Sequence, residues 1–487
     1  MSERVEQFST RWGMMVAMLG MAVGTGNIWR FPRVAATNGG GSFLVAWVVF
    51  LLLWSVPLIL VEFAMGRATR SGPIGAFARL VGKRYTWMGA WVAWTAIAIM
   101  FYYAVVTGWT IRYSWAALTG QLRGAEPGAV WEGFAYTWSV VGFQALALAI
   151  AVFVVARGVR GIETAARFLI PSLFLLVVIL AIRAVTLPGA ERGLEFLFTP
   201  TWEGLSNPTV WLQALTQNAW DTGAGWGLIV TYAVYMRRRE DTALNAFVLG
   251  FGNNSVSLLA GIMVLCTVFS IMPDAASQIV GAGNEGLTFI WVPQLFARMP
   301  AGSIFMVLFF VALFFAALTS LISMAELATR MLQDLGVSRA RAITTIAVLG
   351  FLLGIPSALN ADMFGNQDFV WGVGLMVSGL FFAVAVLRYG VTRFRESFIN
   401  TAHADIRIGA WWDWVMRLVV VQALVLVGWW FWQVKGENPW GAFGWANMAL
   451  QFAVALAVFL ALNGWMSRRL TAQVPEEERE NPILSVP

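Results

Sequence analysis

Two glycine-rich runs interrupt long apolar stretches of the sequence and carry its most unusual polar residues. Residues 20–27 hold three glycines and Asn27, and residues 220–227 hold three glycines and Asp221. A helix that breaks at such a run exposes backbone N–H groups at a positive dipole end, which attract an anionic group, and carbonyl oxygens, which attract a cation. The two runs therefore predict a site for a zwitterion together with a hard cation.

The rest of the chain offers few reactive side chains. The single cysteine, Cys266, cannot form a disulfide within the chain, and the single histidine, His403, cannot build a histidine-rich metal site. A membrane enzyme would need a nucleophile–base pair or a metal cluster. We therefore expect neither enzymatic activity nor an organic cofactor.

The composition places both runs in an integral membrane protein. Of the 487 residues, 59% are hydrophobic and 12% are charged, whereas ordinary globular domains carry about 25% charged residues. A helix needs about 20 apolar residues to cross a lipid bilayer, and the sequence contains twelve such stretches. They lie near residues 12–36, 42–66, 87–116, 138–156, 165–187, 209–236, 243–272, 302–332, 342–359, 368–390, 411–434 and 443–466. The shorter, glycine-broken region 276–299 is expected to form a re-entrant or surface helical hairpin.

The basic residues indicate the orientation of these spans. Lys and Arg concentrate in cytoplasmic loops, and 24 of the 32 basic residues fall in segments on the same side of the membrane as the N-terminus. We therefore expect both termini in the cytoplasm, with residues 1–11 as an N-terminal segment and residues 467–487 as a solvated tail. Membrane topology also explains the net charge of +6, so no nucleic-acid partner is expected.

The positions of the two interrupted spans indicate an internal repeat. They are the first and the sixth span, which makes them corresponding members of two five-span halves, residues 12–187 and 209–394, followed by spans 11 and 12 in residues 411–466. Paired broken helices of this kind are typical of inverted-repeat transporters whose substrate site lies near the membrane midplane.

Five sequence runs carry a resemblance to a known family. In chain order they are GMAVGTGNIWRFPRVAATNGGGSF (20–43), VEFAMGR (61–67), FYYAVVTGW (101–109), GWGLIVTYAVY (225–235) and FFAALTS (314–320). Together they resemble the neurotransmitter:sodium symporter family, whose bacterial members have the LeuT-type fold, over about residues 8–465. The resemblance implies an all-α fold with 12 transmembrane helices and a 5+5 inverted repeat. It also implies sodium-coupled uptake of amino acids or their derivatives across a prokaryotic inner membrane, by a monomer or a homodimer.

Two sodium sites follow from the resemblance. The first would be formed by Ala22, Asn27, Asp221 and Asn253. The second would be formed by the carbonyl oxygens of Gly20, Val23 and Ala316 and the hydroxyl groups of Thr319 and Ser320.

The resemblance also implies a small-molecule substrate site. The backbone amides of Thr25 and Gly26 and the hydroxyl of Tyr103 would hold a carboxylate. The other substrate contacts would come from Ala22, Ile99, Trp220, Gly223, Trp226, Ser320 and Met324. Monoamine transporters of the family have Asp at the position of Gly24, so an amino acid fits this chain better than a monoamine does. The two tryptophans stand where the family usually has Phe, which favours a hydrophobic or aromatic substrate, although such a pair can equally shrink the pocket.

Asp221 is the main departure from the family, whose members carry Ser or Thr at this position. An ionised carboxylate at the membrane centre is costly unless it meets a cation. Chloride-dependent relatives bind an anion beside this position, and this chain keeps Gln217 and Ser257 there but has Trp47 in place of a Tyr. A fixed carboxylate without the full chloride site predicts chloride independence.

Asp221 has a second possible use, as a proton carrier. If no sodium occupies the first site, desolvation would favour the protonated carboxyl group. The alternative function is therefore a proton-coupled, sodium-independent transporter of an aromatic metabolite such as an indole or amine. The retained residues of the second sodium site favour sodium coupling.

The resemblance finally implies two gates. Arg30 and Asp368 would form the outer ion pair, and Asp334 would form the inner one with Arg4. Phe8 replaces a tryptophan that the family has near the inner gate. Alternating access would rock spans 1, 2, 6 and 7 against spans 3, 4, 8 and 9.

Overall fold

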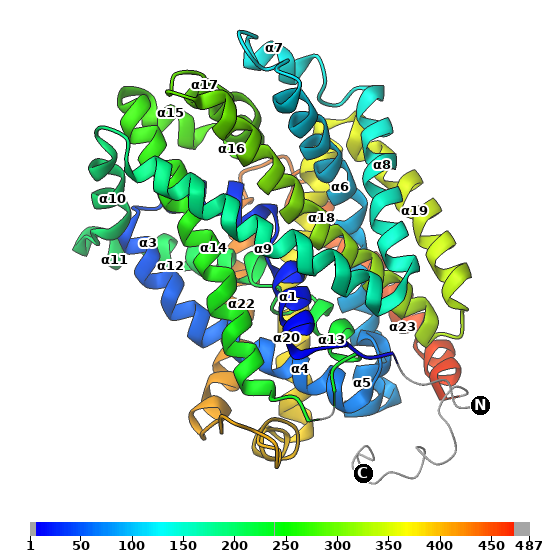
Figure 1. Cartoon of the computed structure of the whole chain (residues 1–487). Coiled ribbons are helices and arrows are strands. Elements are labelled where there is room, and N and C mark those ends of the chain that lie inside the picture. The colour runs from blue at the N-terminus through cyan, green and yellow to red at the C-terminus, as the bar shows by residue number, and fades with distance from the viewer. Residues whose placement is uncertain (1–5, 238, 472–487) are drawn as a thin grey trace.

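Helices are the only regular secondary structure in the described residues. The computed structural model describes residues 6–237 and 239–471, and these residues contain no β-strand. Within them, ten helical runs are long and apolar enough to cross a membrane (Figure 1). They are α3–η2–α4 (Gly41–Phe50, Leu51–Ser55, Val56–Thr69), η3–α6 (Lys83–Tyr85, Thr86–Leu118), α8 (Trp138–Ala156), α9 (Gly158–Val185), α14 (Thr242–Ile271), α18 (Gly302–Asp334), α19 (Arg339–Leu359), α20 (Ala361–Tyr389), α22 (Trp411–Gln433) and α23 (Trp445–Thr471).

The first and sixth spans are each divided into short helices. The first consists of α1 (Arg11–Ala22), η1 (Gly26–Arg30) and α2 (Phe31–Thr37), and the sixth consists of α12 (Pro208–Asp221) and α13 (Leu228–Ala233). None of these pieces is long enough to count among the ten uninterrupted spans. Together with the ten, the two divided spans give the twelve that the sequence predicts.

Local sequence explains where the two spans break. α1 starts after Thr10, whose side chain accepts a hydrogen bond from the Gly13 N–H, and it ends at Val23 in an extended conformation (φ −73°, ψ 105°). In the sixth span, three glycines between α12 and α13 have positive φ angles, of 71° at Gly223, 85° at Gly225 and 78° at Gly227. Side chains with a Cβ rarely adopt this left-handed region, whereas glycine adopts it readily. The glycines therefore fix the break to the segment between the two helices.

The connecting segments define two faces of the molecule. We call the face with residues 6–10, α5 (Pro73–Val81), α21 (Val391–Phe394) and η6 (Arg395–Ile399) the N-terminal face. The opposite, distal face carries shorter connecting helices (Figure 1). These are α7 (Pro127–Glu132), α10 (Ala190–Phe198), α11 (Trp202–Ser206), η4 (Pro273–Ala275), α15 (Ala276–Gly281), α16 (Gly283–Glu285), η5 (Gly286–Trp291) and α17 (Val292–Ala297). The last four occupy the region that the sequence predicts to be a hairpin rather than a span.

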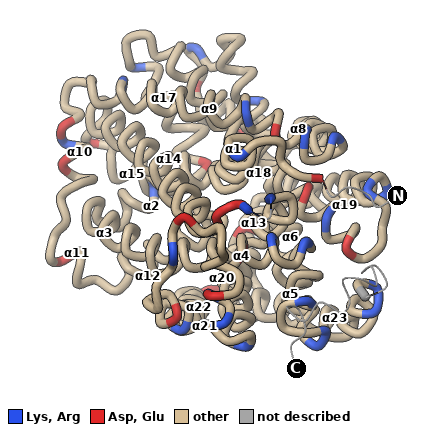
Figure 2. Tube along the Cα trace, turned by 60° about the horizontal axis from the view of Figure 1, so that its bottom comes forward, with Lys and Arg blue, Asp and Glu red and all other residues tan. Residues whose placement is uncertain are grey.

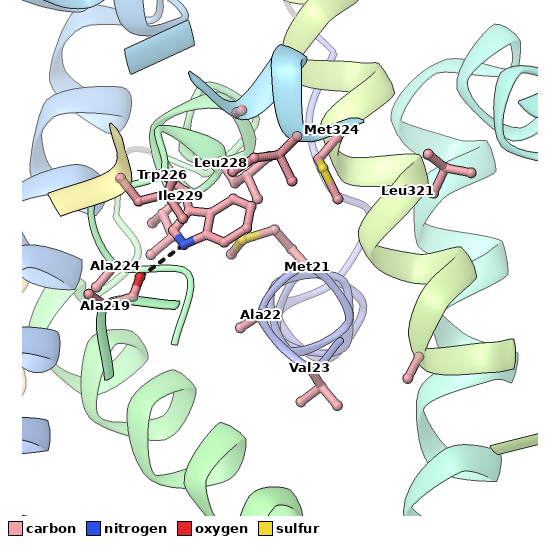
Figure 3. Packing of buried hydrophobic residues seen from close by; sticks show 14 of the residues in the cluster. Met21, Ala22, Val23, Ala219, Ala224, Trp226, Leu228, Ile229, Leu321 and Met324 are labelled. Carbon is pink, nitrogen blue, oxygen red and sulfur yellow. Dashed lines mark hydrogen bonds between the residues drawn. The ribbon is translucent and has the colours of Figure 1, made fainter. Parts of the chain in front are cut away.

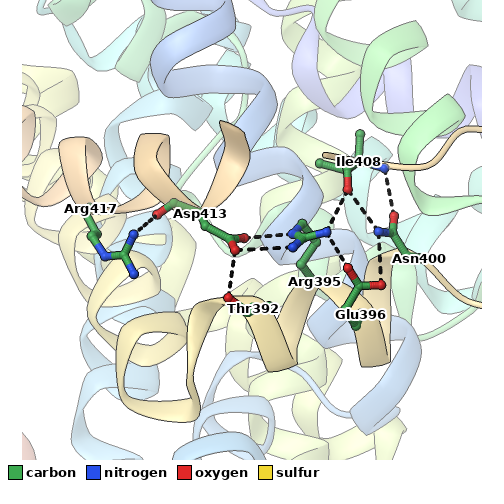
Figure 4. Close-up of polar contacts among 7 residues, drawn as sticks. All are labelled: Thr392, Arg395, Glu396, Asn400, Ile408, Asp413 and Arg417. Atoms are coloured by element: carbon green, nitrogen blue, oxygen red, sulfur yellow. Dashed lines mark hydrogen bonds and ion pairs between the residues drawn. The ribbon is translucent and has the colours of Figure 1, made fainter. Parts of the chain in front are cut away.

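Charged residues of both signs lie on the N-terminal face (Figure 2), and several of them form ion pairs. In η6, the Arg395 Nε donates to Asp413 Oδ1 at 2.8 Å, and a second guanidinium nitrogen donates to the Ile408 carbonyl at 3.1 Å (Figure 4). The hydrogen bond to Asp413 raises the pKa of the Arg395 guanidinium. The Asp241 carboxylate accepts the N–H of Leu244 at 2.9 Å, that of Ile406 at 3.0 Å and that of Asp405. The loop between η6 and α22 is therefore held at its base by α22 and at its tip by the start of α14.

Candidate functional site

The two breaks face a central cavity at the middle of the helix bundle. Its empty volume is about 740 Å³, and part of this space is open. Residues from the first and sixth spans, α6, α16, α18 and α20 line it: Met21, Ala22, Gly24, Thr25, Gly26, Asn27, Trp29, Arg30, Tyr102, Tyr103, Val106, Trp220, Asp221, Gly223, Trp226, Leu228, Asn284, Glu285, Ser320, Met324, Phe364 and Asp368. Nine of the ten predicted substrate residues belong to this set. Ile99, one helical turn before Tyr103 on α6, is fully buried and does not line the cavity.

One end of the cavity offers polar groups and no room for a side chain at position 24. The Thr25 N–H and the Thr25 hydroxyl both donate to the Tyr103 hydroxyl oxygen, each at 3.1 Å. A Cβ atom at Gly24 would lie 2.9 Å from the Ser320 Oγ and 3.1 Å from the Tyr103 hydroxyl oxygen. A side chain at this position would therefore have to displace the Ser320 hydroxyl and crowd the Tyr103 hydroxyl. This end of the cavity therefore has hydroxyl and backbone N–H groups but no acidic side chain at position 24.

The other end of the cavity is apolar and aromatic. Figure 3 shows Met21, Trp226, Leu228 and Met324 gathered around this space. The Trp226 Nε1 donates to the Ala219 carbonyl at 3.2 Å, an acceptor that the break after α12 leaves without its helical partner. The indole is therefore fixed by the interrupted helix that carries it.

Trp220 lines the same space on the side of the distal cavity, which it also lines. Its ring lies 6.1 Å from the Trp226 ring in an edge-to-face arrangement, and the Arg30 guanidinium stacks over it at 4.7 Å. A Cβ atom at Gly372 would come within 2.0 Å of the Trp220 ring. The glycine on α20 thus makes room for a side chain larger than the phenylalanine usual in the family.

A cluster of buried oxygen atoms joins the two breaks where the first sodium site is predicted. The Asn27 side-chain amide donates to Asn253 Oδ1 at 3.0 Å and to the Ser257 hydroxyl at 2.8 Å, and that hydroxyl donates to Asp221 Oδ2 at 2.6 Å. The other carboxylate oxygen, Asp221 Oδ1, is buried and has no hydrogen-bond partner in residues 6–237 and 239–471. Buried polar atoms normally have a partner, so an unpaired carboxylate oxygen beside two asparagine side chains fits a bound cation.

The position beside this cluster where chloride-dependent relatives are expected to bind an anion has the Trp47 ring on α3 in place of a hydroxyl. Trp47 packs its ring against Phe31, with 4.6 Å between centroids. The Ser257 hydroxyl already donates to Asp221. The Ser257 hydroxyl is therefore already engaged by the fixed carboxylate.

The residues predicted for the second sodium site meet where α1 ends against α18. The Ser320 Oγ lies 3.5 Å from the Val23 carbonyl oxygen, and a Cβ atom at Gly20 would lie 3.4 Å from the Thr319 Cβ. The Thr319 hydroxyl donates back to the carbonyl of Ala316 at 3.1 Å and to that of Phe315 at 3.0 Å. All five predicted residues are thus brought together, and every available ligand atom is oxygen.

The two predicted outer-gate residues share a cavity without direct contact. Arg30 and Asp368 both line the central cavity and a larger cavity toward the distal face, which we call the distal cavity. Asp368 accepts a hydrogen bond from the Tyr102 hydroxyl at 3.0 Å, and Arg30 stacks on Trp220. Among the described residues, no ion pair within 4.0 Å joins the two. In this conformation, the expected outer contact is not made.

The predicted inner gate has a different partner within the described residues. Asp334 pairs with Arg330 one turn earlier on α18, at 3.1 Å. Arg4 lies outside the described part of the chain. Phe8 is buried and packs against Tyr232 and Tyr235, with 6.3 Å between ring centroids in each pair. An aromatic side chain thus occupies the position where the family has tryptophan.

Two buried glutamates were not identified as site residues from the sequence. Glu62 on α4 is fully buried and accepts the Gly225 N–H at 2.7 Å and the Val230 N–H at 3.3 Å, so it binds the broken segment of the sixth span. Glu326 on α18 accepts hydrogen bonds from the Tyr235 hydroxyl at 2.6 Å and from Arg339 at 2.7 Å. The available signal was a single acidic residue inside a long apolar stretch, which is costly in a membrane and marks a functional position.

Comparisons with known proteins agree with this geometry. The model of the sodium:neurotransmitter symporter family matches residues 5–135 and 132–473. An uncharacterized sodium-dependent transporter of Bacillus subtilis, YhdH, is 31% identical over 86% of this chain and 96% of its own length. The sodium-dependent serotonin transporter of Drosophila melanogaster is 26% identical over 80% of this chain and 71% of its own length.

A solved structure has the same architecture. The crystal structure of MhsT in complex with L-phenylalanine superimposes with a TM-score of 0.77 at 32% identity, covering 87% of this chain and 99% of that one. The predicted LeuT-type fold is thereby confirmed, with its broken first and sixth helices and twelve spans in an integral membrane protein.

Proposed function

The chain belongs to the sodium:neurotransmitter symporter family, and from this premise we propose that it imports a neutral hydrophobic or aromatic amino acid by sodium symport. The observation that carries the proposal is the central cavity, with polar groups at one end and indole and thioether groups at the other. The lack of space at Gly24 favours a substrate with a carboxylate over a monoamine. The similarity to a transporter structure that holds L-phenylalanine supports the same substrate class.

In our proposal, sodium binds at two sites. Asp221 supplies the charge of the first site and the α1–α18 junction supplies the oxygen ligands of the second. Because Asp221 also occupies the hydroxyl donor of Ser257, transport needs no chloride. The N-terminal face lies in the cytoplasm, so both termini are inside, and Arg30 and Asp368 close the cavity from the distal face during the cycle.

One observation favours a second candidate. A buried carboxylate with one unpaired oxygen can bind a proton as well as a sodium ion, so Asp221 could couple an aromatic metabolite to protons instead. The two functions differ in whether binding of the organic substrate requires sodium ions or protons.

A thermal-stability assay on the purified protein tests the proposal. A ligand that binds only the folded state at 100 times its Kd stabilises it by about 2.7 kcal/mol. We expect L-phenylalanine or a related amino acid to raise the Tm in sodium chloride and in sodium gluconate but not in potassium salts. A shift that is indifferent to sodium and changes with pH would instead establish the proton-coupled alternative.

A further inference from the structure

Four side-chain amides form a connected cluster between α20, α23 and the loop that precedes α23. We call Asn366, Gln367, Asn447 and Gln451 the carboxamide cluster. The Gln451 Nε2 donates to Asn366 Oδ1 and to Asn447 Oδ1, each at 2.9 Å, and the Gln367 Nε2 also donates to Asn366 Oδ1 at 2.9 Å. The cluster lies in the first two turns of two membrane-spanning helices, where Asn366 is buried and the other three side chains are half-buried.

Every polar group of the cluster has a partner. The Gln367 Oε1 accepts from the Trp371 indole at 2.9 Å, and the Gln451 Oε1 lies 3.5 Å from the Gln367 Nε2. The two remaining amide nitrogens donate to the loop, Asn366 to the Ala442 carbonyl at 2.6 Å and Asn447 to the Gly441 carbonyl at 3.1 Å. A polar network in which every group has a partner rigidifies the elements that it joins. The rotation of α20 against α23 is therefore fixed at this level.

The same level of α20 carries the carboxylate of the proposed outer gate. Asp368 follows Gln367 directly, on an adjacent face of the helix, where it accepts a hydrogen bond from the Tyr102 hydroxyl and lines both cavities. Successive residues on a helix are about 100° apart, so a turn of α20 about its axis would move Asp368 along the cavity wall. The cluster thus acts on the direction in which Asp368 points.

The loop held by the cluster also reaches the distal cavity. Phe443 follows the carbonyl acceptor Ala442, lines that cavity and packs on Phe369 with 5.9 Å between ring centroids. A Cβ atom at Gly365 would lie 2.8 Å from the Phe443 ring. The loop and α20 are therefore in close contact on the cavity side as well as at the cluster.

From these contacts we propose that the carboxamide cluster positions Asp368, so that α23 takes part in closing the central cavity from the distal face. The inference rests on the proposed role of Asp368 in the outer gate. It gives the twelfth span a function, for which the sequence offers no argument. Gln451 is the central member because it joins both helices.

A cysteine-labelling experiment that needs no substrate tests this inference. Val106 is buried in the wall of the central cavity, and the native thiol Cys266 is fully buried, so Val106→Cys gives a selective probe for a small thiol reagent. Loss of hydrogen bonds worth about 1 kcal/mol corresponds to a roughly fivefold change in the equilibrium between the closed and the open cavity. We expect Gln451→Leu to raise the labelling rate of the probe by about that factor, and Asn447→Leu to act in the same direction.

Two comparisons make the test specific. Gln422→Leu on α22 is the matched control, because Gln422 is buried in a neighbouring span and its Oε1 has no hydrogen-bond partner in the described residues; it should leave the labelling rate unchanged. In an Asp368→Asn background, Gln451→Leu should add no further increase, since residues that act through one another are non-additive. An unchanged rate in Gln451→Leu, or a full additional effect in the Asp368→Asn background, would overturn the inference.

The same samples separate this inference from the proposed function. If the unsubstituted protein shows no sodium-dependent stabilisation by any amino acid, the proposed transport function fails. The labelling rates still decide whether the cluster controls access to the cavity.

Discussion

The two broken spans contribute to one cavity in different ways. The first span breaks through an extended residue, Val23, and presents backbone groups and a neutral amide, Asn27. The sixth span breaks through three left-handed glycines and presents a carboxylate, Asp221, and two indole rings. We infer that the first break recognises what all amino acids share, whereas the sixth sets ion coupling and side-chain selectivity. The predictions below test this division.

Removing the charge of the sixth break should have the largest effect. Breaking a buried charge pair costs about 3–5 kcal/mol, so Asp221→Asn should weaken sodium-dependent amino-acid binding by at least about 100-fold. Isothermal titration in sodium and in potassium measures this loss. Asp362→Asn, an exposed acid at the start of α20, is the control and should bind normally. Unchanged sodium dependence in Asp221→Asn would remove Asp221 from ion coupling.

A methyl group in the first break should have the next largest effect. Gly24→Ala brings a Cβ to 2.9 Å from the Ser320 Oγ, and overpacking of this kind costs about 1–3 kcal/mol. We expect affinity for all substrates to fall by about 10- to 100-fold without a change in their order of preference. Gly142→Ala on α8, where a Cβ meets no atom within 4 Å, serves as control. A changed substrate preference in Gly24→Ala would contradict the division between the breaks.

Neutralising Glu62 should loosen the sixth break alone. The Glu62 carboxylate accepts the N–H groups of Gly225 and Val230, and hydrogen bonds to a charged group contribute about 1.5–3 kcal/mol against about 1 kcal/mol for a neutral one. Glu62→Gln should therefore lower the free energy of unfolding by about 1–2 kcal/mol, measured by thermal unfolding without ligand. Exposed Glu203→Gln on α11 should have no effect, and equal stability of the two variants would show that Glu62 does not hold the break.

The smallest effect is expected from the indole nitrogen of the sixth break. Trp226→Phe keeps an aromatic ring but leaves the Ala219 carbonyl without its 3.2 Å hydrogen bond, a loss of about 1 kcal/mol. Affinity for phenylalanine should fall by about fivefold, while the preference for tryptophan over phenylalanine should rise because the pocket is larger. Competition binding measures both quantities. An unchanged preference would mean that Trp226 does not contact the substrate side chain.

The breaks and spans could be predicted because their causes are local. Apolar length determines a membrane span, and glycine density determines a break, so the positions of Gly223 and Gly225 sufficed without tertiary information. The position of Ile99 could not be predicted in the same way. Whether it lines the cavity depends on how far the cavity extends along α6, which the packing of side chains from several helices decides.

Contacts between residues that lie far apart in the chain could not be predicted from the sequence either. The pairing of Glu326 with Arg339 and the capture of the sixth break by Glu62 join helices that lie far apart in the chain. The sequence marked such acids only as isolated charges in apolar stretches. The separation of Arg30 from Asp368 depends in addition on the conformation of the gate. The same sequence adopts every conformation of the transport cycle, so it does not indicate which contacts are made in one of them.

The Asp241 carboxylate has a consequence for local unfolding. This one side chain accepts the amide N–H of Leu244 in the first turn of α14 and those of Asp405 and Ile406 in a loop more than 150 residues later. Leu244 donates to Oδ1 of this carboxylate and Asp405 and Ile406 donate to Oδ2, so a movement of the one side chain exposes all three amides. In hydrogen–deuterium exchange, these three amides should therefore gain and lose protection together, so that the start of the seventh span and the loop before the eleventh behave as one cooperative unit.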